Sequence, residues 1–287
     1  MQDLRLALRA FWWRRGSSAV VLVVAALTVA AAAIGPLYAA AATESVLQDR
    51  LRGATALQTT IAFRMDADVS YPGSIGAVAA AQAERGELPG YGPVVDWVSV
   101  STAVQGGSSV PAQTQVVWRD NACEHLRLVE GRCPTEVGEV IASERSAEAF
   151  GWRLGTVLKF EGLQRYDTSV AGSEVATRGV ALKLVGTYRP NSTTEPYWAG
   201  RPFFAASPLT APGGDGPETV DAVFVTRGLF ETLVHPTPGS IGSDLVLGHP
   251  EQLRMADVPA LRTAIEGYLG PTAEGPAPTT EVLALLD

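Results

Sequence analysis

Residues 16–42 contain no charged side chain, and this run limits the folds open to the chain more than any other feature of the sequence. As an α-helix rising ~1.5 Å per residue, the run would extend about 40 Å, beyond the ~30 Å hydrocarbon core of a bilayer. Gly35 and Pro36 interrupt it only late in its length. The run therefore predicts a transmembrane helix over residues 16–42.

The charges on either side of this run predict its orientation. Residues 1–15 carry four arginines and one aspartate, a net charge of +3, so the formal charge of -8 for the whole chain leaves -11 for the remainder. By the positive-inside rule, Met1 lies in the cytoplasm and the residues after Thr43 lie outside. Apolar residues at helical spacing predict that residues 1–15 form a cytoplasmic amphipathic segment on the inner membrane surface. We therefore expect a cell-membrane protein with a single pass in this chain and an extracytoplasmic bulk.

A cleaved signal peptide is the alternative interpretation of the same segment. It has a basic start, an apolar stretch and a run of small residues at Ala39–Ala42. The apolar run is longer than the ~7–15 residues of a usual signal-peptide core, which favours a retained anchor. Either interpretation exports the rest of the chain.

The composition of the exported part excludes several classes of function. Its strong negative charge argues against nucleic-acid binding. Neither the G-x-x-x-x-G-K-[ST] motif of a P-loop nor the G-x-S-x-G motif of a hydrolase occurs. We therefore predict no enzyme activity, no catalytic residue, no cofactor and no metal site. The low lysine content beside many arginines, alanines and glycines is typical of a GC-rich, actinobacterial-type genome.

Two cysteines, Cys123 and Cys133, predict a disulfide, because an even number of cysteines in an oxidising compartment usually forms bridges. Closing so short a loop would contribute about 2.5–3 kcal/mol in the chain-entropy model. His125 is the one histidine close to them, so a zinc site would lack ligands.

Periodicity after the membrane helix predicts an α+β fold with two lobes. Residues 43–56 are expected to form a stalk, in which Thr43–Arg52 continues the helix until Gly53. Alternating strands and helices over 57–93 and 219–272 predict an α/β lobe, and the strands within 94–218 predict a β-rich lobe. The expected strands are 57–65, 94–104, 113–119, 139–142, 157–161, 181–188, 220–225 and 244–247, and the expected helices are 74–85, 121–131, 144–150, 228–234 and 259–269.

Aromatic residues gather in the Pro-rich excursion over 189–218. Tyr197 and Trp198 stand near Phe203 and Phe204. They predict either an exposed contact surface or ordinary loop packing, of which packing is favoured.

One stretch carries short motifs in a fixed order. They are Glu130-Gly131-Arg132 with Pro134, Gly138-Glu139-Val140 with Ser143, Phe150-Gly151, Leu154-Gly155 and Val185-Gly186. This order resembles the extracytoplasmic core domain of FtsX-like and MacB-like ABC transporter permeases. Two positions depart from that pattern: Thr156 replaces a common acid, and Cys133 interrupts E-G-R-x-P.

The resemblance implies a permease subunit whose partner is a cytoplasmic ABC ATPase. It also implies contacts with the remaining permease helices or a second permease copy, with membrane lipids, and with an extracellular protein or lipid ligand. ATP-driven helix motion would reach the extracytoplasmic domain for export or for activation of an envelope partner. Because the family has further membrane helices, residues 273–287 are expected to begin a linker to a second span that the sequence lacks. The alternative is a signal-anchored or secreted binding module with no ATPase.

Overall fold

The computed structural model describes residues 15–69, 88–106, 111–166, 176–205, 220–233, 237–269 and 279–286. The chain divides into two compact units, Met1–Arg52 and Gly53–Asp287, which we call the anchor and the body. The predicted amphipathic segment before Arg15 and the predicted helix over 74–85 lie outside the described residues.

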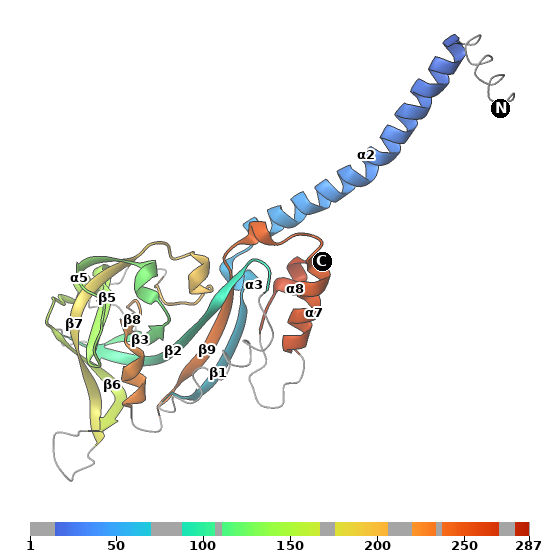
Figure 1. Cartoon of the computed structure of the whole chain (residues 1–287). Coiled ribbons are helices and arrows are strands. Elements are labelled where there is room, and N and C mark those ends of the chain that lie inside the picture. Colours follow the sequence, from blue (N-terminus) through green and yellow to red (C-terminus); the bar gives the residue numbers. More distant parts are fainter. Residues whose placement is uncertain are drawn as a thin grey trace, which may run out of the picture. The chain divides into compact units, whose positions relative to one another are not determined.

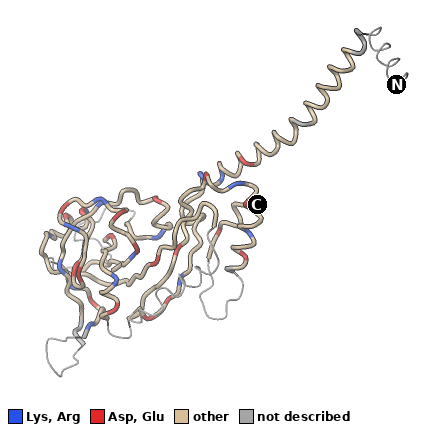
Figure 2. The backbone as a smooth tube through the Cα atoms, viewed as in Figure 1, with Lys and Arg blue, Asp and Glu red and all other residues tan. Residues whose placement is uncertain are grey.

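The described part of the anchor is the helix α2 (Arg15–Gly53), which runs unbroken through the predicted membrane segment and the stalk as far as Gly53 (Figure 1). From Ala19 onward it is long and apolar enough to cross a membrane, with a mean hydropathy of 2.5 in its most apolar part. Figure 2 shows its charges gathered toward the C-terminal end. The hydroxyl of Thr28 donates to the carbonyl oxygen of Val24 at 2.7 Å, so the helix itself satisfies this polar group.

The body contains nine strands and several short helices within its described residues. Its strands are β1 (Ile61–Asp68), β2 (Tyr91–Gln105), β3 (Ala112–Arg119), β4 (Leu126–Gly131), β5 (Glu139–Ser143), β6 (Val157–Tyr166), β7 (Ala176–Pro190), β8 (Val223–Val225) and β9 (Pro238–Leu247). Its α-helices are α3 (Ala56–Thr59), α5 (Glu144–Phe150), α6 (Arg227–Glu231), α7 (Val258–Leu269) and α8 (Val282–Leu285). The 3-10 helices are η2 (Ala122–His125), η3 (Pro196–Trp198) and η4 (Pro250–Gln252).

All nine strands join one sheet. Along its main path the order is β1-β9-β2-β3-β8-β5-β7-β4, and β6 pairs with both β2 and β7. Most pairs are antiparallel, whereas β8 runs parallel to β3 and β5 runs parallel to β7. A mixed sheet with short helices, preceded by one long apolar helix, is an α+β fold, as the sequence predicts (Figure 1).

The sheet has an apolar cluster on each face. Neighbouring residues of the central strands alternate between the clusters: Val140 belongs to one and Ile141 to the other, as do Val223 and Phe224. This alternation follows from the two-residue period of a strand. α5 and α6 contribute to the first cluster, and the segment around η3 contributes to the second.

The structure confirms the helix predicted over 144–150, which is α5. The hydroxyl oxygen of Ser143 accepts a hydrogen bond from the N–H of Ser146 at 3.2 Å, and Gly151 ends the helix in a left-handed conformation. Both signals are local in the sequence, and this explains why the helix could be predicted.

Other predicted elements are present with different bounds. The strands expected at 94–104 and 113–119 are the antiparallel pair β2 and β3. The strand expected at 244–247 begins earlier, at Pro238, because its first half pairs with the end of β1 as well as with β2.

The helix predicted over 121–131 is wrong. The short η2 ends at His125, and the following residues form strand β4. Asn121 has a left-handed φ of 59°, and its side chain makes no capping hydrogen bond. The run that begins at Leu126 pairs instead with β7, whose register with β4 extends from Pro190 to Gly186. Pairing with a distant strand therefore overrides the local capping signal.

One sheet runs through both of the predicted lobes. β8, expected beside the strand 57–65, lies between β3 and β5, which belong to the range 94–218. The first and last thirds of the chain meet elsewhere, in the pairing of β1 with β9. The division into an α/β lobe and a β-rich lobe stays a prediction.

Candidate functional site

Several of the motif residues named from the sequence meet on strand β7. Gly131 pairs with Gly186, the carbonyl oxygen of Gly138 accepts from the N–H of Lys183 at 2.7 Å, and the N–H of Gly155 donates to Leu184 at 2.8 Å. The sequence predicts these motifs in order along the chain, but not that they meet on one short stretch of a strand. We call residues 130–139 together with Gly186 the motif corner.

Glycine is required where β4 meets β7 because the two backbones approach closely. Gly131 has a φ of +77°, and a Cβ there would overlap the carbonyl oxygen of Val185 and lie 2.8 Å from the Cα of Gly186. A Cβ on Gly186 would overlap the carbonyl oxygen of Arg132. The two motif glycines therefore fit against each other.

An ion pair closes the motif corner. The guanidinium of Arg132 binds both carboxylate oxygens of Glu139, with Nη1 to Oε2 at 2.7 Å. The backbone N–H groups of Thr135 and Glu136 donate to the same carboxylate at 3.0 and 3.2 Å. Pro134 lies in the segment between Arg132 and Glu139. The pKa of Glu139 is lowered to about 2. The largest cause is the hydrogen bond from Arg132, and the next is the hydrogen bond from the backbone N–H of Thr135.

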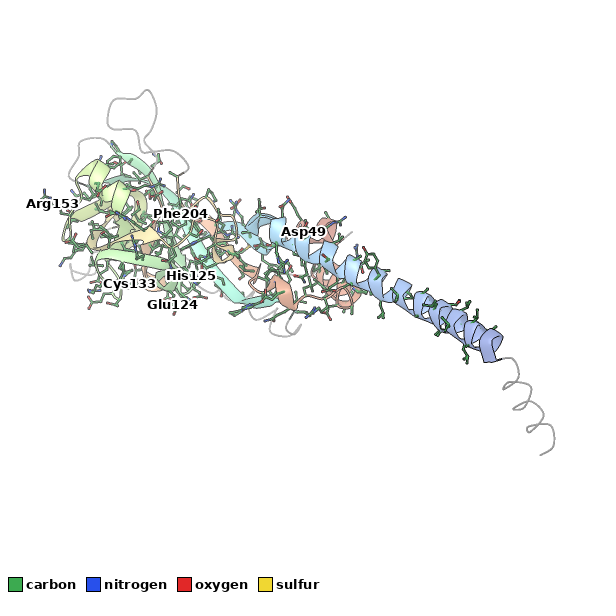
Figure 3. All side chains as sticks on the ribbon, turned by 90° about the horizontal axis from the view of Figure 1, so that it is seen from above. Asp49, Glu124, His125, Cys133, Arg153 and Phe204 are labelled. Carbon is green, nitrogen blue, oxygen red and sulfur yellow. A yellow bond between two sulfur atoms is a disulfide. The ribbon has the colours of Figure 1, made fainter. Side chains whose placement is uncertain are left out.

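The predicted disulfide joins Cys123 to Cys133, with the two Cα atoms 6.4 Å apart. It connects η2 to the motif corner and packs against the cluster that contains Tyr188 and Trp198. Figure 3 shows the sulfur bond beside the label of Cys133, with Glu124 and His125 nearby. Both sulfurs are used in this bridge, so they are not zinc ligands.

Removing the disulfide is expected to destabilise the body without changing its fold. Replacing Cys123 and Cys133 by serine should lower the free energy of unfolding by about 2.5–3 kcal/mol, because the unfolded chain loses a short closed loop. Chemical denaturation of the full chain in detergent measures this change, with peptide mapping of the unreduced wild type to verify the bond. The serine variant should be insensitive to reductant. Equal unfolding midpoints for the bridged wild type and the variant would contradict the prediction.

A pocket of about 660 Å³ lies at the other end of β5 from the motif corner. It is lined by Ser143, Glu144, Arg145, Tyr188, Arg189, Pro190, Thr193, Phe204, Ala205 and Asp221. Two ion pairs cross it, one between Arg189 and Glu144 and one between Arg145 and the nearly buried Asp221. Sequence reasoning missed this pocket, because its residues come from four separate segments. The sequence offers one sign of the pocket, Asp221 at the start of the apolar run 220–225.

The lining offers charged and aromatic groups rather than an activated nucleophile. The hydroxyls of Ser143 and Ser146 bond each other at 2.7 Å, and among the described lining residues there is no histidine or cysteine. The hydroxyl of Tyr188 donates to the carbonyl oxygen of Ala222, and burial raises its pKa far above the usual range. The arrangement can hold a polar or mixed-charge group between aromatic walls.

The aromatic residues of the Pro-rich excursion pack into the body. Trp198 is fully buried and Phe203 is 2% exposed. Trp198 meets Phe204 edge to face, with ring centroids 4.9 Å apart, and His125 stacks on Tyr197 at 3.5 Å. Of the two interpretations left open by the sequence, loop packing is therefore the observed one.

A buried charge cluster joins the strands behind these aromatics. Asp244 on β9 accepts from Arg119 Nη1 at 2.7 Å and from Arg201 Nε at 2.9 Å, and neither Asp244 nor Arg119 has an exposed side chain. The guanidinium of Arg201 lies 3.7 Å above the ring of Trp97, and that of Arg119 lies 4.8 Å above Tyr197. This cluster holds β3, β9 and the excursion together through charge and π contacts.

Asp96 on β2 is another buried carboxylate, and among the described residues it forms no ion pair with an arginine. The hydroxyl of Ser243 donates to the carboxylate of Asp96, and the backbone carbonyl oxygen of Asp96 accepts from the N–H of Asp120 at 3.0 Å. Burial is the largest cause that raises the pKa of Asp96, while the Ser243 hydrogen bond opposes it. Folding therefore favours the neutral acid more than the unfolded chain does.

This preference predicts how stability changes with pH. Because the folded pKa is raised, the stabilisation from protonated Asp96 is present at low pH and is lost as pH rises through the folded pKa. Asp96→Asn should therefore be more stable than the wild type at pH 7, with a flatter dependence on pH below neutrality. Thermal unfolding of both chains between pH 4 and pH 7 checks this. A variant that is less stable than the wild type at pH 7 would overturn the assignment.

Comparisons with known proteins were made with both sequence and structure. No protein-family model matches the sequence. No curated protein matches it either.

Three solved structures resemble the fold. The extracellular domain of the noncanonic ABC-type transporter YknZ from Gram-positive bacteria is 11% identical, with a TM-score of 0.38 over 77% of this chain and 98% of that one. A domain of a proposed permease from Porphyromonas gingivalis is 12% identical, with a TM-score of 0.36 over 74% and 82%. The periplasmic region of MacB from Actinobacillus actinomycetemcomitans is 13% identical, with a TM-score of 0.35 over 74% and 83%.

Proposed function

We propose that this chain is the N-terminal part of a permease subunit of an ABC transporter of the FtsX/MacB type. In this proposal α2 crosses the cell membrane with Met1 in the cytoplasm, and the body lies outside. A cytoplasmic ABC ATPase supplies the energy, and the body itself makes or breaks no bond. The subunit works with the remaining permease helices or a second permease copy, and the body meets an extracellular protein or lipid.

The unbroken helix α2 is the observation that carries the proposal. It has no described interruption between the apolar run and Gly53, where the body begins. A continuous helix transmits displacement along its axis because each turn is tied to the next by backbone hydrogen bonds. Movement of the span driven by ATP would therefore reach Gly53, and glycine there provides a pivot.

The motif corner supports the choice of family. Its residues Gly131, Gly138, Glu139 and Gly186 come from motifs that resemble those of the permeases, and they meet on β7. We propose that the corner and its disulfide keep this end of the sheet rigid, so that displacement arriving at the body moves it as a unit. The pocket beside α5 is a place where a ligand could bind to the moving body.

Purification from native membranes tests the proposal. A C-terminally tagged full chain should resist extraction by alkaline carbonate, retain Met1 at its N-terminus, and co-purify with a protein that carries ABC ATPase motifs. A mature terminus near Thr43 and a carbonate-extractable chain would contradict the anchor and support the secreted binding module. A retained anchor with no ATPase in the purified complex would support the signal-anchored module instead.

A flexible insertion tests the route of coupling. Gly-Ser residues inserted before Gly53 should leave expression and ATPase binding intact but uncouple ATP turnover from the event outside. A helical Ala-Glu-Ala-Ala-Lys insertion of similar length is the matched control, because it keeps the helix stiff. Full export or sensing with the flexible insertion would exclude force transmission through α2.

A further inference from the structure

Strand β4 ends the described sheet and pairs with β7 along one side only. All its residues after Leu126 are exposed, including the apolar Leu128 at 38% and Val129 at 43%. A strand edge of this kind presents unpaired backbone groups, which proteins either protect or use for pairing.

The backbone groups of Leu128 point away from β7. The N–H of Asn191 donates to the carbonyl oxygen of His125 at 3.2 Å, so His125 directs its backbone groups toward β7. In an antiparallel ladder this direction alternates along the strand, so Arg127 also faces β7 while Leu126 and Leu128 face outward. Leu128 therefore offers one N–H and one C=O to another strand.

A β-bulge places the two charged residues of β4 on the same face. The register is Arg127↔Arg189, Leu128↔Tyr188 and Glu130↔Thr187. Val129 is thus the extra residue of the bulge. Side chains of directly opposed residues share a face, and alternate residues of β7 share a face, so Arg127 and Glu130 lie on one side and Leu128 on the other. Within the described residues neither Arg127 nor Glu130 forms an ion pair.

We propose that β4 pairs antiparallel with β4 of a second copy of this chain, around a two-fold axis at Leu128. Such an axis stands perpendicular to the sheet and preserves its faces, so residues equally distant from Leu128 become opposed. Counted by the residues of β7 opposite them, Arg127 and Glu130 each lie one position from Leu128, because Val129 is the extra residue of the bulge. Arg127 of each copy therefore faces Glu130 of the other, and two ion pairs flank a pair of Leu128 residues.

Charge complementarity distinguishes this arrangement from simple protection of the edge. Charges and bulges on an edge also discourage pairing. Protecting the edge requires only that it carry charge. Opposite charges on one face, at equal distances from Leu128, are in addition complementary to those of a second copy of the same strand. Six residues bury less than the ~1,200 Å² of a stable interface, so the pairing needs two copies held in one membrane. The proposed pairing of β4 therefore rests on the proposed membrane anchor.

Cross-linking at the axis is the first test. The full chain carrying Leu128→Cys, in native membranes, should form dimers with a short bis-maleimide that leaves the native disulfide intact. Val157→Cys is the matched control, because that residue is 53% exposed and lies on β6, opposite Lys183 of β7, five residues from the partner of Leu128. Dimers from Leu128→Cys but not from Val157→Cys are expected. Equal yields from the two variants, or none from Leu128→Cys, would overturn the proposal.

Charge reversal is the second test, in the Leu128→Cys background. Arg127→Glu or Glu130→Arg should each lower the cross-linked fraction roughly tenfold, because two attractions become two repulsions. Membranes that contain both variants, with different tags, should regain the cross-link between unlike chains, since their charges are again complementary. Cross-linking that ignores charge, or fails to recover in the mixture, would contradict self-pairing. Both residues are exposed, so the unfolding midpoints should match the wild type.

The ATPase provides the readout that separates the two proposals. If the cross-link fails while the ATPase still co-purifies, the pairing is wrong and the permease assignment stands. If the chain leaves the membrane on carbonate treatment, the permease assignment fails, and the pairing, which needs two copies held in one membrane, fails with it.

Discussion

Asp244→Ala is expected to lower the free energy of unfolding of the body by about 3–5 kcal/mol, the largest effect among the substitutions considered. Asp244 is fully buried and is the shared partner of Arg119 and Arg201. Without it, two guanidinium groups remain in the interior with only carbonyl and π contacts. The free energy of leaving buried charge unpaired is much larger than the stability lost when an exposed ion pair is removed.

Asp66→Ala is the matched control for this substitution. Asp66 is also a strand carboxylate paired with an arginine, Arg64 at 3.1 Å, but its side chain is 74% exposed. Its loss should change stability by no more than ~1 kcal/mol. Chemical denaturation followed by tryptophan fluorescence reports both variants, since Trp97 lies beneath Arg201. Similar midpoints for the two variants would mean that the buried cluster does not stabilise the body.

Gly131→Ala should have the second largest effect, roughly 3 kcal/mol. Alanine there must adopt a φ of +77° and must also push its Cβ into the carbonyl oxygen of Val185. Either β4 separates from β7 or the backbone shifts, and both disturb the motif corner. Gly248→Ala is the control, because nothing lies within 4 Å of a Cβ at that position. Thermal unfolding should separate the two variants by several degrees, and coincident curves would show that the close approach is not needed.

The elements that could be predicted from the sequence are those with local signals. α5 has its cap at Ser143 and its stop at Gly151, and both act within a few residues of the helix. β2 and β3 are rich in β-branched residues and adjacent in the chain, so their pairing closes a short connection. The long apolar helix required only composition and length.

Long-range pairing accounts for what the sequence did not reveal. Asn121 and Glu124 have capping-box spacing just before β4, yet β4 is a strand because β7, some sixty residues later, pairs with it. β8 has only three paired residues, and its position between β3 and β5 has no local signal. A period-two pattern indicates a strand but does not name its neighbours.

The candidate site shows the same limit. The motif residues Arg132 and Glu139 could be named from the sequence, whereas the ion pair between them could not. The buried cluster joins Arg119 to Asp244 across more than a hundred residues. An aspartate inside an apolar strand was the one available sign of it, because such a residue needs a buried partner.

Nucleotide-dependent labelling of the stalk tests whether ATP-driven movement of α2 reaches the body. Right-side-out native membrane vesicles carrying Val46→Cys would be treated with an impermeant maleimide, with and without internal ATP and vanadate. Val157→Cys on β6 is the matched control, since both residues are 53% exposed. Trapping the ATPase should change the labelling rate at residue 46, because the helix shifts relative to the membrane surface, while the rate at residue 157 stays the same. Identical rates at residue 46 in the two states, with the ATPase present and trapped, would contradict this prediction.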